Sequence, residues 1–234
     1  MTTRALKAIR SLNITSTSEE DQRAKMRFID AFFNDFEDKV AYLSELYRAG
    51  RRDEARILCS CYIDGLALAL YWPDARSKFS FVRILKEHGG NSIFSYIHPK
   101  MLDEALSKLS ESSNKWKAIY GSVSDELGRR AGKLYSEQEI AEVLEPFLSA
   151  DNMQKVKRVL WQGSFAAIVY DRFRVDAVHG FGPPDGITFD RTTFQDNPVP
   201  VIDFKMVHDC LKRVAAVCKQ VSKQSGKLFG HDYK

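Results

Sequence analysis

The sequence predicts an all-α fold, and three observations carry that prediction. Apolar residues recur at three- and four-residue spacing over residues 19–50 and again over 203–224, the period of a helix with one buried face. Residues 51–72 form a more apolar run that stops at Pro73. The β-like runs, Ile-Thr-Phe and Val-Pro-Val-Ile, are short and lie within 187–202. We therefore expect an up-and-down helical bundle with one small extended or β-hairpin excursion.

The first two predicted helices should form an antiparallel hairpin. Ser16 and Ser18 are capping residues in front of the first helix, and Gly50 is placed to end it. The second helix follows at once, with acidic residues near its start, where they oppose the positive end of the helix dipole. A connection this short favours two helices that pack side by side in opposite directions.

The rest of the chain predicts one domain over residues 1–234, with a flexible N-terminus at 1–17. Shorter helical pieces over 74–150 read as a variable helical insertion. Residues 152–180 predict one long helix that is apolar on most sides and therefore central. Residues 181–202 are rich in proline and glycine, which predicts an extended arm or hairpin between the last two helices.

Composition limits the function classes. The 234 residues carry 35 Lys plus Arg against 31 Asp plus Glu, a formal net charge of +4. That excess is too small for a nucleic-acid coat protein but allows a local anion site. The four cysteines match neither common zinc spacings nor a redox pair, which predicts reduced thiols. We find no secretory signal, and the longest apolar run, 59–72, is short of the roughly 20 residues that span a bilayer. We expect a cytoplasmic protein without membrane contact.

Polar residues gather at the end of the predicted central helix. His179 lies where helix carbonyls concentrate negative partial charge, which favours a protonated imidazole. Arg174 offers a planar fork of donors that suits a phosphate. A histidine that moves a proton and an arginine that stabilises charge on phosphorus can together cleave a phosphodiester.

Helix geometry restricts how this pair works. Five steps of roughly 100° place Arg174 and His179 roughly 140° apart on a regular helix, so they do not share a face. The split arrangement fits a frayed helix end or two copies of the helix meeting at a dimer axis. Arg172, Asp176 and His179 do share a face, and there a surface ion pair with a capping histidine is the alternative.

The stretch AAIVYDRFRVDAVHGFGP resembles the R-x4-6-H signature helix of the HEPN superfamily. The resemblance extends loosely from Met26 to Lys219 and is specific only over Tyr170–Gly180. It implies a HEPN-type bundle in which Arg174 and His179 are the active pair of a metal-independent endoribonuclease, in a cleft formed by a homodimer. It also implies a toxin or defence effector paired with a small nucleotidyltransferase-like antitoxin, and no cofactor.

Four further residues are candidate accessory groups. Arg172 and Asp176 would position the phosphate and the histidine, and Tyr170 opens the signature run. Asp64 could serve the site as a second carboxylate, although a buried acid is more often the structural partner of an arginine or tyrosine. Many active HEPN members have a polar residue directly after the arginine, where this chain has Val175.

Two other functions stay open at the level of sequence. One is a non-catalytic HEPN-like module that binds a nucleotide or a protein partner in the same pocket. The other is a helical scaffold in which the arginine–histidine cluster only caps the helix. The last helix has a basic side, for which a solvated face is the default and contact with an RNA backbone the alternative; its residues are Lys205, His208, Lys212 and Arg213.

Overall fold

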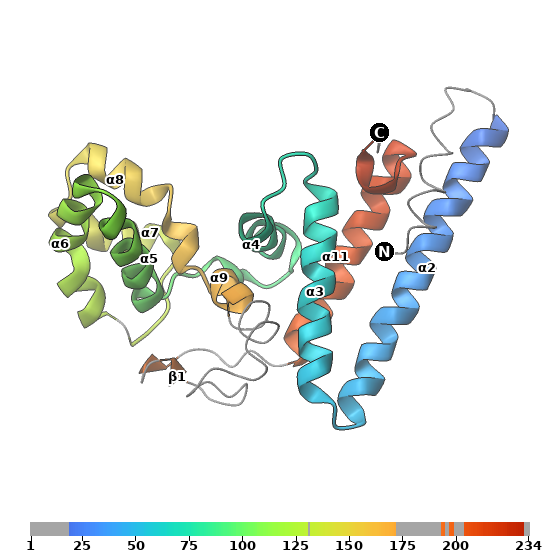
Figure 1. Cartoon of the computed structure of the whole chain (residues 1–234), viewed down its shortest axis with the longest axis horizontal. Helices are drawn as coiled ribbons and strands as arrows, with labels where there is room; N and C mark the ends of the chain where they lie inside the picture. Colours follow the sequence, from blue (N-terminus) through green and yellow to red (C-terminus); the bar gives the residue numbers. More distant parts are fainter. Residues whose placement is uncertain (1–18, 131, 172–192, 195–196, 199–203, 232–234) are drawn as a thin grey trace.

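The computed structural model describes residues 19–130, 132–171, 193–194, 197–198 and 204–231. Nearly all regular structure in these residues is helical, as the sequence predicts (Figure 1). The elements in chain order are α2 (Glu19–Arg48), α3 (Arg52–Leu70), α4 (Ser77–His88), η1 (Ser92–Ser95), α5 (Pro99–Ser112), α6 (Asn114–Arg129), α7 (Glu137–Leu144), η2 (Glu145–Phe147), α8 (Ala150–Lys157), η3 (Leu160–Gly163), α9 (Phe165–Val169), β1 (Thr193–Phe194), β2 (Asn197–Pro198), α11 (Phe204–Ser225) and η5 (Leu228–Gly230).

Helices α2 and α3 form the predicted antiparallel hairpin. Gly50 has φ +85°, a left-handed conformation that glycine adopts without strain. The Gly50 amide donates to the Tyr47 carbonyl, and the Arg51 amide donates to the Leu46 carbonyl, which satisfies the last carbonyls of α2. The turn therefore reverses the chain within three residues after Arg48.

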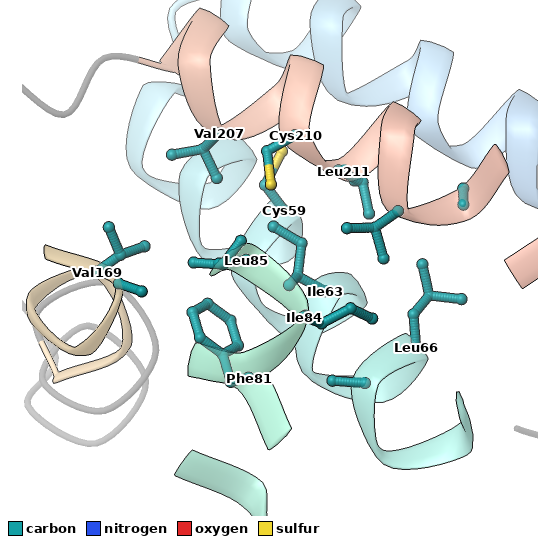
Figure 2. Packing of buried hydrophobic residues seen from close by; sticks show 14 of the residues in the cluster. Cys59, Ile63, Leu66, Phe81, Ile84, Leu85, Val169, Val207, Cys210 and Leu211 are labelled. Carbon is teal, nitrogen blue, oxygen red and sulfur yellow. The ribbon is translucent and has the colours of Figure 1, made fainter. Parts of the chain in front are cut away.

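Helix α11 runs through the middle of the first group of helices and packs against α2, α3 and α4 (Figure 1). Its buried residues include Val207, Leu211 and Val214, which recur at helical spacing. Figure 2 shows Val207, Cys210 and Leu211 meeting apolar side chains of α3 and α4. Among the described residues, the last long helix is thus packed against three others in the first core, a place that the sequence predicts for the helix over 152–180.

Helices α5–α8 build a second core at the other end of the molecule (Figure 1). Its buried residues come from one stretch of the chain, Ile97 to Leu160, whereas α4 belongs to the first core. The two groups are joined at Ile97, which forms antiparallel bridges to both Tyr135 and Ser164. The chain leaves the first core and returns to it at the same place.

The predicted single helix over 152–180 is wrong in the part that the structure describes. Three shorter helices, α8, η3 and α9, replace it up to Val169. The Gly163 carbonyl accepts from the His98 amide, and the Phe165 amide donates to the Tyr96 carbonyl. Ser164 begins α9 by accepting from the Ala167 amide. Backbone groups bonded to a neighbouring segment are unavailable to a continuous helix, so the chain breaks where it crosses between the cores.

One pair of short strands lies within the predicted arm. In β1 and β2, Thr193 faces Pro198 and Phe194 faces Asn197 in an antiparallel register. The other residues of 181–202, and the predicted flexible segment 1–17, lie outside the described residues. Among the helices that the structure describes, none is both long and apolar enough to cross a bilayer.

Candidate functional site

The structure describes two of the six site residues that the sequence predicts. Tyr170 and Asp64 are described; Arg172, Arg174, Asp176 and His179 lie outside the described residues. Tyr170 is held at the end of α9, where its amide donates to the Ala166 and Ala167 carbonyls. It therefore marks the point from which the chain continues toward Arg174 and His179.

Asp64 is a buried carboxylate in the middle of α3, with only 4% of the residue exposed. It interrupts an otherwise apolar stretch, and a carboxylate in such a place needs hydrogen-bond partners. The Ser77 hydroxyl lies 3.1 Å from Asp64 Oδ1 and 3.3 Å from Oδ2, and donates to this carboxylate. Helix α4, which begins at Ser77, thereby brings a polar group to α3.

Tyr170 joins the same cluster from α9. Its phenol oxygen lies 2.9 Å from Ser77 Oγ. Its ring packs edge-on against Phe81, with 5.2 Å between the ring centroids. Ser77 and Phe81 are four residues apart on α4, so one face of that helix holds both ends of the tyrosine side chain.

The direction of these hydrogen bonds follows from which of the three groups carry a proton. A serine hydroxyl has one proton, and a carboxylate can only accept. Ser77 therefore donates to Asp64, and Tyr170 donates to Ser77. The result is a chain of hydrogen bonds in which the phenol donates to the serine hydroxyl and the serine hydroxyl donates to the carboxylate.

The next residue on each element makes a second link. Lys78 Nζ lies 2.8 Å from Asp171 Oδ2, and about a third of each side chain is exposed. Two consecutive residues of α4 thus hold two consecutive residues at the end of α9. Among the described residues, this is where the predicted site residues Asp64 and Tyr170 come together.

Sequence reasoning missed Ser77 and Lys78. A serine at the start of a predicted helix usually indicates a cap, because its hydroxyl satisfies a free backbone amide. Here Arg76 is the capping residue and makes no side-chain capping bond, and the Ser77 hydroxyl bonds Asp64 instead. No local pattern distinguishes these two uses of a serine.

The basic side predicted for the last helix is partly wrong. His208 is 4% exposed, and its Nε2 lies 2.9 Å from the Val40 carbonyl oxygen and 3.3 Å from Ser44 Oγ. Burial lowers the pKa of His208 below its ordinary value, which favours the neutral imidazole. His208 is therefore part of the contact between α2 and α11, while Lys212 stays exposed.

A surface groove of about 600 Å³ runs beside His208 between α2 and α11. Its walls mix charges of both signs, with Arg48 and Lys212 close to Glu37 and Glu45. Lys219 also lines it and pairs with Glu37 at 2.8 Å. The mixed charge does not select a cation or an anion.

The three buried cysteines are packing residues of the first core. None of the four forms a disulfide, and Cys59, Cys210 and Cys218 are buried. Figure 2 shows Cys59 of α3 and Cys210 of α11 side by side in the first core. Burial raises the pKa of each buried thiol to about 12, so all three stay protonated and are poor nucleophiles. In the described part of the chain, no group of three His, Cys, Asp or Glu side chains is placed to hold a metal ion.

Comparisons with known proteins assign no family to this chain. No family model matches, and no solved structure matches. The chain is similar to an uncharacterized protein of Methanocaldococcus jannaschii, with 30% identity over 97 residues. That alignment covers 38% of this chain and 23% of the relative, so the chain spans less than a quarter of the relative's length. The similarity brings no activity with it.

Proposed function

We propose that this chain is a metal-independent endoribonuclease of HEPN type that acts as a homodimer. In this proposal His179 is the general acid or base, and Arg174 stabilises the charge that develops on phosphorus. Arg172 and Asp176 position the phosphate and the histidine. The partners are RNA, a second copy of the chain and a nucleotidyltransferase-like antitoxin.

The observation that supports the proposal most is the polar cluster at the end of α9. Asp64 and Tyr170 are predicted as accessory residues of one site although they lie far apart in the sequence, and Ser77 bonds to both. Asp64 is buried and Ser77 and Tyr170 are partly buried, and hydrogen-bonded networks of this kind hold side chains in place, as active sites require. In the sequence, Tyr170 comes shortly before Arg174 and His179.

An RNA-cleavage assay with a chelator present tests the proposal. Wild type should cut single-stranded RNA, whereas His179→Ala and Arg174→Ala should each lose roughly 100-fold or more of the activity, as expected when an acid–base or charge-stabilising group is removed. His88→Ala and Arg48→Ala are matched controls, since both residues lie at helix ends and outside the Asp64 cluster. The controls should cut RNA like wild type.

Two results would overturn the nuclease proposal. One is intact RNA after incubation with a wild-type sample that is dimeric by light scattering. The other is equal cleavage by wild type and His179→Ala. Tight RNA or nucleotide binding without cleavage would instead favour the non-catalytic binding module.

A further inference from the structure

We propose that Ser77 and Lys78 of α4 form a clamp that positions the arginine–histidine segment for catalysis. The inference rests on the proposed nuclease function and assigns a role to two residues outside the predicted site. The clamp consists of the Ser77–Tyr170 hydrogen bond at 2.9 Å and the Lys78–Asp171 ion pair at 2.8 Å. Both residues are positioning residues, because they act through Tyr170 and Asp171.

The first step of the argument is the shape of α9. Phe165–Val169 are all buried, and Tyr170 and Asp171 continue the helix with a π-helical backbone. This helix form is rare in proteins, so the backbone at these two residues depends on tertiary contacts. The contacts made by the next two residues, Tyr170 and Asp171, come from α4.

The second step is how firmly the Tyr170 side chain is held. Tyr170 is held at its ring by Phe81 and at its hydroxyl by Ser77, so neither rotation about its side-chain bonds nor a shift along α4 leaves both contacts intact. Ser77 is held in turn by the carboxylate of Asp64, which projects from the middle of α3. The end of α9 is thereby tied to the first core through two helices.

The third step is the chemistry of the phenol. Since Tyr170 donates its only proton to Ser77, its oxygen keeps a lone pair that can accept a hydrogen bond. Without the Ser77 hydroxyl the phenol proton is free to point elsewhere, and the direction of that lone pair is no longer fixed. Arg174 follows Tyr170 by four residues in the sequence, and in this proposal the position of Tyr170 limits where the catalytic pair can lie. Displacements of about 1 Å can cost roughly 100-fold in rate.

The test compares Ser77→Ala with Ser77→Thr in steady-state RNA cleavage. Ser77→Ala should lower kcat by about 10- to 100-fold with KM within about twofold, because positioning affects the transition state more than ground-state binding. Ser77→Thr keeps the hydroxyl and should restore most of kcat. Tyr170→Phe removes the Ser77–Tyr170 hydrogen bond and keeps the one from Ser77 to Asp64, so it should also lower kcat, and the double variant should lose little more than Ser77→Ala.

Lys78→Met should give a smaller loss, about three- to tenfold, because its ion pair is partly exposed. Lys86→Met is the matched control. Lys86 lies on the same helix but pairs with Glu137 of α7, so this variant should cleave at the wild-type rate. If Ser77→Ala fails to fold, Tyr170→Phe and Lys78→Met carry the same test.

Hydrogen–deuterium exchange separates failure of the clamp from failure of the nuclease. Ser77→Ala should raise deuterium uptake in peptides that cover residues 170–180, whereas Lys86→Met should not. If wild type cleaves RNA and Ser77→Ala matches it in both kcat and exchange, the clamp is overturned and the nuclease proposal stands. If wild type does not cleave RNA but the exchange difference is present, the nuclease proposal is overturned and the clamp stands as a structural device.

Discussion

The two hydrophobic cores of this protein differ in how far apart in the sequence their bonded polar residues are. In the first core, His208 of α11 bonds the Val40 carbonyl of α2, 168 residues away, and Tyr170 bonds Ser77, 93 residues away. In the second core, buried Glu126 is paired with Arg129 and Arg130, three and four residues further along the same helix and its end. The first core therefore joins distant segments through polar groups, and the second core is built locally.

This difference shows where a site can be assembled. Catalytic groups have to be held in place by packed neighbours on different elements, and the first core offers such neighbours around Tyr170. Surface ion pairs within one helix contribute little to stability and do not position a third group. Pairs of that kind occur in both cores, such as Arg83–Glu87 in α4 and Arg130–Glu126 at the end of α6, so they do not decide between the cores. The proposed site belongs with the first core because the bonds of Tyr170 to another element are there.

The largest expected effect comes from a substitution that leaves a cavity in only one of the two cores. Leu106→Ala removes a fully buried side chain from the second core and should cost about 2–5 kcal/mol of its stability. If the cores are separable, deuterium uptake should rise over residues 97–160 and stay unchanged in α2, α3 and α11. Leu43→Ala in α2 is the matched control and should reverse that pattern. A uniform rise in both regions for Leu106→Ala would show a single cooperative unit instead.

The junction between the cores should be sensitive to one added methyl group. A Cβ at Gly163 would lie 2.8 Å from Leu102 Cβ and 3.0 Å from the Leu102 backbone. Gly163→Ala should therefore destabilise the protein by about 1–3 kcal/mol, as overpacking does. Urea unfolding measures this. Gly121→Ala is the control, because a Cβ there meets no atom within 4 Å, and it should leave the protein as stable or more stable. Equal stability of the two variants would mean that the junction is not tightly packed.

The smallest effect is the pH dependence of the contact between α2 and α11. Burial lowers the pKa of His208, and the neighbouring Lys212 lowers it further, while the bond to Val40 and the Asp209 carboxylate oppose this. A histidine whose folded pKa lies below the unfolded value of about 6.5 stabilises the neutral form, so stability is lost as pH falls from about 6.5 through the folded pKa. The slope from this one group is at most about 1.4 kcal/mol per pH unit.

Thermal unfolding between pH 7 and pH 5 measures this contribution. His208→Gln should have a flatter profile than wild type, whereas His88→Gln, at the partly exposed end of α4, should follow wild type. If His208→Gln and wild type have the same pH profile, His208 does not contribute to the pH dependence of unfolding. The α2–α11 contact would then depend on its apolar residues alone.

Residue patterns predicted the helices well where a helix depends on its own sequence. The amphipathic spacing of α2, the left-handed glycine after it and the apolar stripe along α11 are each local patterns, made by residues within a few helical turns. The same reasoning failed at Gly163 and Ser164, because there the backbone bonds go to residues 96–98. It also failed at His208, whose polar side chain satisfies a carbonyl on another helix.

The sequence by itself determined the all-α class, the α2–α3 hairpin, and Asp64 and Tyr170 as candidate site residues. Arg174 and His179 stay predictions of the sequence, since they lie outside the described residues. Only the tertiary structure decided the break before α9, the burial of His208 and the role of Ser77 between Asp64 and Tyr170. The physical reason is range: helical periodicity depends on neighbours three and four residues apart, whereas a buried polar group takes its partner from whichever element packs against it.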